Sequence, residues 1–291
     1  MASTEFRKVV IFGAGLIGGS FALALRAAGA VEEIVGFGRR PSSLREAVEL
    51  GIIDRLGMNM ATELADADLV LVATPVGQMF DIFSSIAPYI GADTIVTDGG
   101  STKSDVERAA RLAFGSKISQ FVPAHPIAGA ENSGASAARY ELYQGKKVVI
   151  TPLPENSDDT LDRVKRAWSL CGADIFELSP AQHDKVFAAV SHLPHLLSFA
   201  LVNDLAIRDD AELFFSYAAS GFRDFTRIAG SHPEMWRDIC LANRTALLKE
   251  LHSYQEQLAD LETALQANDG AALESVFNVA RNARRAWGEK F

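Results

Sequence analysis

The stretch VVIFGAGLIGGS, residues 9–20, begins as a short apolar run, breaks into glycines and resumes with helical periodicity. This order predicts a buried parallel strand, a tight turn and the first turn of a helix. Gly13, Gly15 and Gly18 fall at the G-x-G-x-x-G spacing typical of dinucleotide binding. In such a loop Gly13 allows the sharp turn, Gly15 lets the backbone approach a pyrophosphate, and Gly18 lets the helix pack closely on the strand.

The helix that begins at Leu16 would aim its unpaired N–H groups, those of Leu16 and Ile17 first, at that diphosphate, along with its positive dipole end. An alternative is a secretory signal, because Arg7 and Lys8 precede the apolar run. Glycines in the middle of the run would weaken a signal helix, and the alternation of strands and helices continues downstream. We therefore interpret the stretch as a nucleotide-binding strand, turn and helix.

Composition narrows the class of protein. The chain has 291 residues, of which 48% are hydrophobic, and this is enough for two packed cores. The formal net charge of −9 leaves no basic stripe to displace counterions from nucleic acid, so we expect no nucleic-acid partner. We interpret the acidity as an aid to solubility.

The cysteines and the apolar runs indicate a cytoplasmic protein. Cys171 and Cys240 lie far apart and in no metal-ligand spacing, so neither a zinc site nor a disulfide framework is expected, and no metal is predicted. After the first apolar run, His195 and Asn203-Asp204 interrupt the next candidate for a membrane span. We therefore expect no membrane association and a reducing compartment.

The loop after the second predicted strand, residues 33–37, bears on cofactor choice. NAD-binding units carry an Asp or Glu about 20 residues beyond the glycines, where it bonds the ribose 2′-hydroxyl. This chain has Gly38 at that place, followed by Arg39 and Arg40. Without the carboxylate a 2′-phosphate is not repelled, and either arginine could clamp it. We predict NADP in preference to NAD; the alternative is that both arginines are merely solvated.

The strand predicted at 68–73 ends in Thr74-Pro75, where proline stops further strand pairing. Ligands of an open parallel sheet lie outside the carboxyl ends of its strands. Thr74 and Pro75 are therefore placed to touch the cofactor.

Two candidate catalytic residues follow the next strands. Ser101 lies just beyond the strand 94–98, where it could bond a histidine or a substrate hydroxyl, or equally cap the helix that follows. His125 ends the strand 121–124, within reach of a bound nicotinamide, and Pro126 fixes the chain after it. A lone histidine is often structural, so these residues alone leave the role of His125 open.

The pattern changes after residue 179. The last strands are predicted at 147–152 and 174–178, and only helices are predicted beyond them. We expect an α/β Rossmann-type parallel-sheet domain over residues 1–179 that binds a dinucleotide. An all-α domain over residues 180–291 would follow it.

Two polar clusters interrupt the helical part. Ser191 and His195 are four residues apart within an apolar helix predicted over 181–207, so they share a face, and Pro194 frees a backbone carbonyl one turn back. Arg227 lies beside an apolar run, where burial without an anion would be costly. A substrate carboxylate would supply that anion.

A single long helix is predicted from Trp236 to Leu265. Its apolar residues recur at spacings that alternate between three and four, close to a heptad. So long an apolar seam favours a homodimer, with an intramolecular bundle as the alternative.

Several motifs occur together in the order known from one family. They are the glycine fingerprint, Asp98-Gly99-Gly100-Ser101, HPIAGAE at 125–131, SHLPH at 191–195, GFRDFTR at 221–227, and Trp236. From about residue 8 to its end, the chain resembles the prephenate/arogenate dehydrogenases of tyrosine biosynthesis. The resemblance implies oxidative decarboxylation of a cyclohexadienol, by a dinucleotide-binding domain followed by a helical domain that binds substrate and dimerises.

The resemblance also implies roles for single residues. His125 would accept the proton of the ring 4-hydroxyl, and Ser101 would orient that hydroxyl or the histidine. Ser191 and His195 would line the pocket for substrate and nicotinamide. Arg227 would anchor a substrate carboxylate.

Two further residues complete the implied site. Glu131 would be the acidic gate residue of the family, and Trp236 would close the pocket from its own subunit or from the partner. The turn at Gly38 departs from many relatives, which puts NAD use in doubt. No residue decides between prephenate and arogenate as the substrate.

Two other functions fit part of the sequence. Another two-domain dehydrogenase, of the β-hydroxyacid or imine reductase type, would share the layout without needing His125 or the 191–195 cluster. A non-catalytic NADP-sensing protein would use the glycine loop and the apolar seam. It would leave His125, Ser101 and Arg227 without a purpose.

Overall fold

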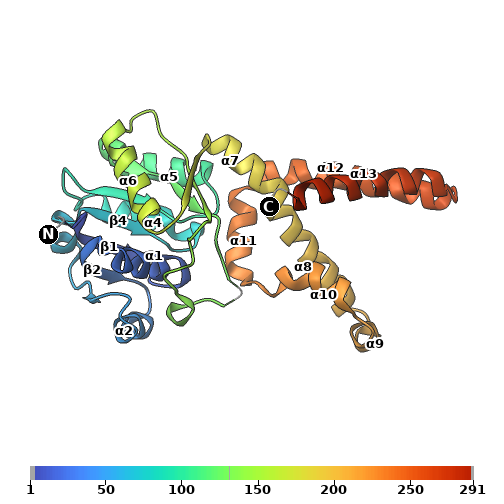
Figure 1. Cartoon of the computed structure of the whole chain (residues 1–291), viewed down its shortest axis with the longest axis horizontal. Coiled ribbons are helices and arrows are strands. Elements are labelled where there is room, and N and C mark those ends of the chain that lie inside the picture. Colours follow the sequence, from blue (N-terminus) through green and yellow to red (C-terminus); the bar gives the residue numbers. More distant parts are fainter. Residues whose placement is uncertain (1–3, 131, 290–291) are drawn as a thin grey trace. The chain divides into compact units, whose positions relative to one another are not determined.

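A computed structural model describes residues 4–130 and 132–289. The chain divides at residue 244 into two compact units, Met1–Arg244 and Thr245–Phe291. Figure 1 shows the order of their helices and strands along the chain.

Six parallel strands form the main sheet of the first unit. They are β1 (Phe6–Phe12), β2 (Val31–Phe37), β3 (Arg55–Leu56), β4 (Leu69–Val72), β5 (Ile95–Asp98) and β6 (Phe121–Val122), arranged as β3-β2-β1-β4-β5-β6. This is the strand order of a doubly wound dinucleotide-binding fold. The expected α/β class is therefore confirmed.

Helices cover both faces of this sheet (Figure 1). They are α1 (Leu16–Ala27), α2 (Pro41–Glu49), α3 (Met60–Ala65), α4 (Met79–Ile86), α5 (Ser104–Phe114) and α6 (Asp158–Leu170). Alternate residues of β1 enter opposite cores: Val9 packs with Phe21 of α1 and Trp168 of α6, and Val10 with Phe83 of α4. Because both faces are covered, residues 9–12 of β1 and all of β4 are apolar.

Three later strands form a small sheet of their own. β7 (Ala124–Pro126) pairs antiparallel with β8 (Lys147–Ile150), which pairs parallel with β9 (Asp174–Glu177). The sequence indicated these strands but not their separation from the parallel sheet. Pro123, which has no N–H to donate, lies between β6 and β7, and it marks the point where the chain leaves the main sheet.

The helix predicted over 181–207 is interrupted. It consists of α7 (Pro180–Phe187), a π-helical turn (Ala188–His192) and α8 (Leu193–Ala206). Pro194 is the physical reason, because it cannot donate the backbone hydrogen bond that would continue an α-helix through the turn. Two short helices, α9 (Ala211–Ser216) and α10 (Ser220–Thr226), follow it.

The prediction of one helix from Trp236 to Leu265 is wrong. The segment forms α11 (Pro233–Ala242) and α12 (Arg244–Gln266), which are separated at Asn243. Asn243 is buried and uses its side-chain amide to donate to the backbone carbonyl of Asp184, 2.8 Å away. This buried hydrogen bond fixes Asn243 where α11 ends. The last helix, α13 (Gly270–Gly288), follows α12.

The run Pro180–Ala206 is long and apolar enough to cross a membrane by length and composition, with 28% of its apolar window buried. This corrects the expectation that polar residues exclude every such candidate. A single run of this kind is weak evidence, since the core helix of a soluble domain passes the same test. Here it holds the π-helical turn and three histidines that hydrogen-bond within the first unit.

Candidate active site

The glycine loop joins β1 to α1 and leaves room for a phosphate group. Gly13 has φ +95°, and a Cβ there would lie 2.7 Å from the carbonyl oxygen of Ala73. A Cβ at Gly18 would collide with Gly13, whereas a Cβ at Gly15 would enter open space. No side chain of the described residues caps α1, so its first amides, at Leu16 and Ile17, remain available to an anion.

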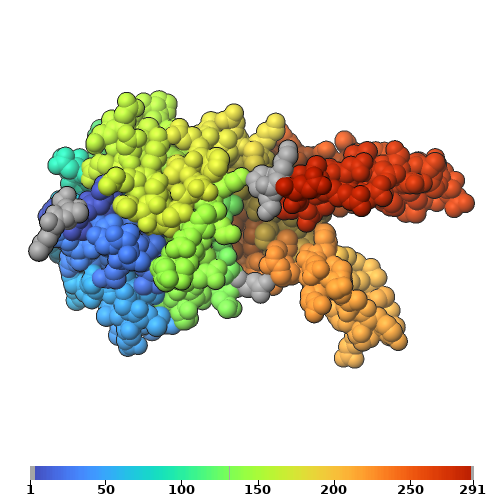
Figure 2. Space-filling model, in the orientation of Figure 1, coloured from blue at the N-terminus to red at the C-terminus, as the bar shows by residue number. Residues whose placement is uncertain are grey.

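A later segment packs against the same helix. The backbone N–H of Arg139 donates to the hydroxyl of Ser20 over 3.0 Å, and the hydroxyl of Tyr143 donates to the carbonyl of Ile17 over 2.6 Å. Figure 2 shows this part of the chain, in light green, beside the blue N-terminal segment. Glu131, the predicted gate residue, lies outside the described residues.

The other predicted cofactor contacts lie at the carboxyl ends of β2 and β4, the two strands that flank β1. Arg39 and Arg40 follow β2 and are exposed. Thr74 and Pro75 follow β4, and the buried hydroxyl oxygen of Thr74 finds no hydrogen-bond partner in the described part of the chain. The open space at Gly15 and this unpartnered hydroxyl both fit a bound dinucleotide.

A buried ion pair holds the Ser101 turn. Nζ of Lys103 lies 2.6 Å from Oδ2 of Asp98, and both side chains are fully buried. The same carboxylate accepts from the backbone N–H of Gly100 (2.7 Å) and of Ala124 (3.0 Å). Asp98 thus joins the end of β5 to the start of β7, and so joins the Ser101 turn to the strand of His125.

Ser101 does not cap the following helix. α5 begins at Ser104, and the backbone N–H groups of Lys103 and Ser104 donate to the carboxylate of Asp184 over 2.8 and 2.9 Å. The cap of α5 therefore comes from α7. Although burial opposes the charged form, the hydrogen bonds from His183 and Ser104 lower the pKa of Asp184 to about 2.

His125 lies on β7 and contacts α7. Its Nδ1 lies 2.8 Å from Nε2 of His183, and Nδ1 of His183 lies 2.9 Å from Oδ1 of Asp184. The ring of Phe187 meets the His125 ring edge-on at 4.9 Å between centroids. Burial, with a smaller effect of His183 and Lys103, holds the pKa of His125 well below its usual value. At neutral pH the ring is therefore uncharged, as a proton acceptor must be.

The SHLPH motif places its two histidines against Trp236. The His195 ring stacks on the indole with 3.6 Å between centroids, and the His192 ring meets it edge-on at 6.1 Å. Nδ1 of His195 lies 2.8 Å from the carbonyl oxygen of Ser191. Trp236 therefore contacts both histidines of this motif within one chain.

Arg227 is exposed at the start of a 3₁₀ turn, Arg227–Gly230, and is not in the buried position that the sequence suggested. It lies close enough to His195 to add to the effect of burial in lowering the pKa of that histidine. An exposed guanidinium needs no anion for its own stability. It lies beside the histidine that stacks on Trp236.

The structure brings most of the predicted residues together and adds four. His192 lies close enough to His125 to help lower the pKa of that histidine, and His195 does the same for His192. These three histidines therefore form one cluster. The four additions are Lys103, His183, Asp184 and Asn243. His183 and Phe187 share a helix face by their spacing, and this pattern could have suggested His183. No cluster of His, Cys, Asp and Glu in the described residues could hold a metal ion.

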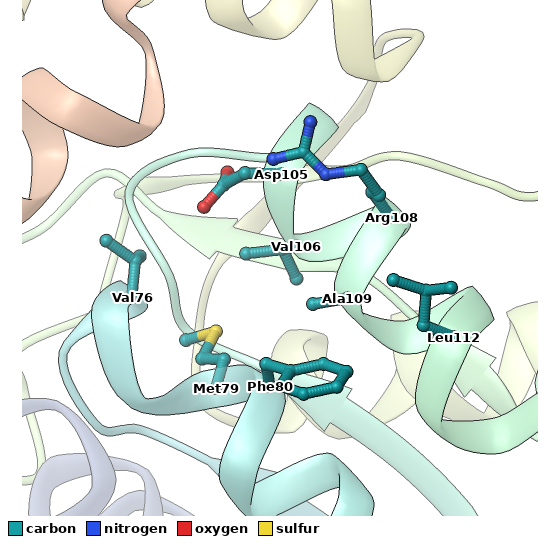
Figure 3. A pocket seen from close by; sticks show the side chains of 8 residues that line it. All are labelled: Val76, Met79, Phe80, Asp105, Val106, Arg108, Ala109 and Leu112. Atoms are coloured by element: carbon teal, nitrogen blue, oxygen red, sulfur yellow. The ribbon is translucent and has the colours of Figure 1, made fainter.

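A cavity of about 300 Å³ lies elsewhere, between α4, α5 and the 3₁₀ turn Val76–Gln78 (Figure 3). It is lined by Val76, Met79, Phe80, Asp105, Val106, Arg108, Ala109 and Leu112. None of the predicted site residues lines it.

The buried histidines make folding stability depend on pH. Burial lowers the pKa of His192 to about 4, below the ordinary value near 6.5, so the folded state binds this proton more weakly. The contribution of neutral His192 to the free energy of unfolding is complete above pH 6.5. It is lost as the pH falls toward 4, by about 1.4 kcal/mol per pH unit. We expect His192→Asn to lose less stability between pH 7 and pH 5 than the wild type. Urea unfolding at both pH values measures this, and equal losses would contradict it.

The doubly wound sheet has a glycine loop with room for a phosphate, and the neutral ring of His125 lies beyond its strand ends. These features define an NAD(P)-dependent dehydrogenase. The family model of the prephenate dehydrogenase nucleotide-binding domain matches residues 21–177, and that of the prephenate dehydrogenase dimerization domain matches residues 179–279. The chain belongs to the prephenate dehydrogenase family.

Individual relatives agree with this. The cyclohexadienyl dehydrogenase of Zymomonas mobilis is 33% identical, over 97% of both chains. The crystal structure of prephenate dehydrogenase from Aquifex aeolicus, in complex with hydroxyphenyl propionate and NAD+, is 36% identical with a TM-score of 0.89 and covers 98% of this chain and 99% of that one. The Synechocystis arogenate dehydrogenase structure is 29% identical with a TM-score of 0.80, covering 96% and 99%.

Proposed function

We propose that the protein catalyses the oxidative decarboxylation of prephenate, arogenate or both, for tyrosine biosynthesis, with NADP as the preferred oxidant. The observation that carries this is the neutral His125 ring, which lies beyond the strand ends of a dinucleotide-binding sheet in a chain of this family. The products are 4-hydroxyphenylpyruvate or tyrosine, with carbon dioxide.

The chain's own residues position the substrate and accept one proton. A bound nicotinamide would supply the acceptor for the hydride of ring C4, the ring carboxylate would leave as carbon dioxide, and aromatisation would drive the reaction. His125 takes the proton of the 4-hydroxyl and returns it to the phenolate oxygen of the product, and Ser101 orients that hydroxyl. Arg227 anchors a carboxylate. The stacked rings of His195 and Trp236 form an apolar wall, beside Ser191.

The direct test of this function is reduction of the nicotinamide, followed by absorbance. Purified protein receives prephenate or arogenate, each with NADP or with NAD. Reduction with either substrate supports the proposal, and the most active pair gives the specificity. Tight binding of NADP without reduction in any of the four mixtures would contradict the proposal and favour an NADP sensor.

The Aquifex relative was crystallised with NAD+, so it does not support NADP. We propose the preference for NADP from the Gly38 turn alone. A Cβ at Gly38 would lie 3.4 Å from Leu44, an ordinary contact, so an aspartate fits there. Its carboxylate would repel a 2′-phosphate and accept from a 2′-hydroxyl. We expect Gly38→Asp to shift the ratio of kcat/KM for NADP over NAD toward NAD by about 10- to 100-fold, the value of a charged hydrogen bond.

The uncharged variant Gly38→Asn is the matched control for size. It fills the same space without a charge, and it should shift the ratio by only a few-fold. A ratio that moves equally in both variants would show that space rather than charge sets the preference.

We also propose a cytoplasmic homodimer in which residues 1–179 bind the dinucleotide and residues 180–291 bind substrate and dimerise. Support comes from the family models, whose matches meet near residue 178, although the compact units divide at 244. α12 and α13 also expose large apolar side chains that a second copy would cover. These are Leu248, Tyr254, Leu258, Leu265, Val276, Phe277 and Val279.

A further inference from the structure

We propose that His183 and Asp184 act as positioning residues that fix His125 as the Nδ1–H tautomer and thereby make its Nε2 the proton acceptor. The inference rests on the proposed function only in naming the proton that Nε2 receives. The arrangement itself is independent of the substrate.

The tautomers follow from the ionised state of Asp184. Its carboxylate accepts hydrogen bonds from two amides at the start of α5 and has no proton to donate. The facing Nδ1 of His183, 2.9 Å away, must therefore carry a hydrogen. A neutral His183 ring then has a lone pair on Nε2, and the contact of 2.8 Å to His125 requires the hydrogen to lie on Nδ1 of His125.

Burial holds this assignment in place. The His183 side chain is fully buried, and burial is the main reason that its pKa is lowered, which keeps the ring neutral. The position of Asp184 is fixed by the α5 amides and by Asn243, which donates to its backbone carbonyl over 2.8 Å. Asp184, His183 and His125 thus form a hydrogen-bonded relay, which is anchored to the start of α5 and the end of α11.

The relay also offsets the charges that oppose a protonated His125. Lys103, His183 and His192 all disfavour the cation, and the neighbouring Phe187 ring offers no compensating charge. When His125 takes up a proton on Nε2, its Nδ1–H continues to donate to His183, and the Asp184 carboxylate stabilises the resulting positive charge through that ring.

His192 supplies an internal contrast. The Nδ2 amide group of Asn243 is a donor, and it lies 3.1 Å from Nδ1 of His192, so that nitrogen must be an acceptor. His192 is therefore the Nε2–H tautomer, the opposite of the one inferred for His125 and His183. The two forms can be told apart in one sample.

The experiment is ¹⁵N NMR of histidine-labelled full-length protein, without substrate, with the ring signals of His125 assigned by their absence in His125→Asn. We expect His125 to be protonated on Nδ1, and His192 on Nε2. A wild-type His125 ring protonated on Nε2 would overturn the proposal. Because no substrate is present, this result stands or falls separately from the proposed function.

Two variants of His183 separate the relay from simple packing. Gln places a carbonyl oxygen near the former Nε2 and keeps an acceptor for His125, whereas Asn reaches only the former Nδ1 and removes that acceptor. We expect His183→Asn to lower kcat by about 10²-fold through misplacement of the base, with a mixed His125 tautomer and KM unchanged within a few-fold. His183→Gln should recover most of the activity and restore the single tautomer.

The surface substitution His252→Asn is the control for replacing a histidine, because His252 is exposed. It should change neither the tautomer of His125 nor the turnover. Equal losses of kcat in His183→Asn and His183→Gln, with the His125 tautomer unaltered in both, would overturn the relay and leave His183 a packing residue.

Discussion

Replacing His125 with asparagine should lower kcat by about 10²–10⁴-fold, the usual contribution of a positioned general base. The asparagine side chain can still donate to Nε2 of His183 from the position of the former Nδ1, so the local packing survives. It lacks the nitrogen that would receive the hydroxyl proton. Steady-state assays with prephenate and with arogenate measure the effect.

Substrate binding should change little in this variant, because the proton moves only in the transition state. A comparison of KM and of the dissociation constant for NADP with the wild type checks this. Turnover equal to wild type in His125→Asn would remove His125 from the mechanism.

The second large effect concerns stability. Lys103→Met should lower the free energy of unfolding by about 3–5 kcal/mol, because it leaves the carboxylate of Asp98 buried without its counter-charge. For a chain of this size that corresponds to a fall in melting temperature of about 10 °C. Calorimetry of the wild type and the variant at pH 7 gives both quantities.

Two matched changes test the cause. The double variant Asp98→Asn with Lys103→Met removes the buried charge, keeps an acceptor for a backbone N–H, and should recover most of the loss. Lys165→Met removes a lysine from a partly exposed pair with Glu177, 2.8 Å apart, and should cost less than about 1 kcal/mol. A loss in Lys165→Met as large as in Lys103→Met would contradict the role of burial.

The parallel sheet could be predicted because the sequence patterns of its strands, turns and helices lie next to one another in the chain. The apolar run that ends in Gly13 is followed at once by its helix, and the next strands alternate with helices in the same manner. The separate sheet β7-β8-β9 could not be predicted in this way, because its antiparallel pair joins residues 124–126 to 148–150. Pairing over such a separation depends on the whole fold.

The site shows the same division. Strand-end positions and motif resemblance predict His125, Ser101 and the 191–195 cluster as site residues. Asp184 escaped notice because its function is to cap α5, which begins 80 residues earlier in the chain. The break at Asn243 was missed because heptad spacing continues through it, and only the buried bonds of Asn243 to α7 and His192 end the helix.

The cap that Asp184 provides also limits how the site can move. Because the carboxylate holds the first amides of α5 and the His183 ring contacts β7, α7 is fastened at two points to elements that precede it in the chain. The junction near residue 178, where the family models meet, therefore cannot serve as a hinge without breaking buried bonds. Opening and closing around a ligand would have to use segments outside this joint, and such a motion would leave the contact between His125 and His183 unbroken.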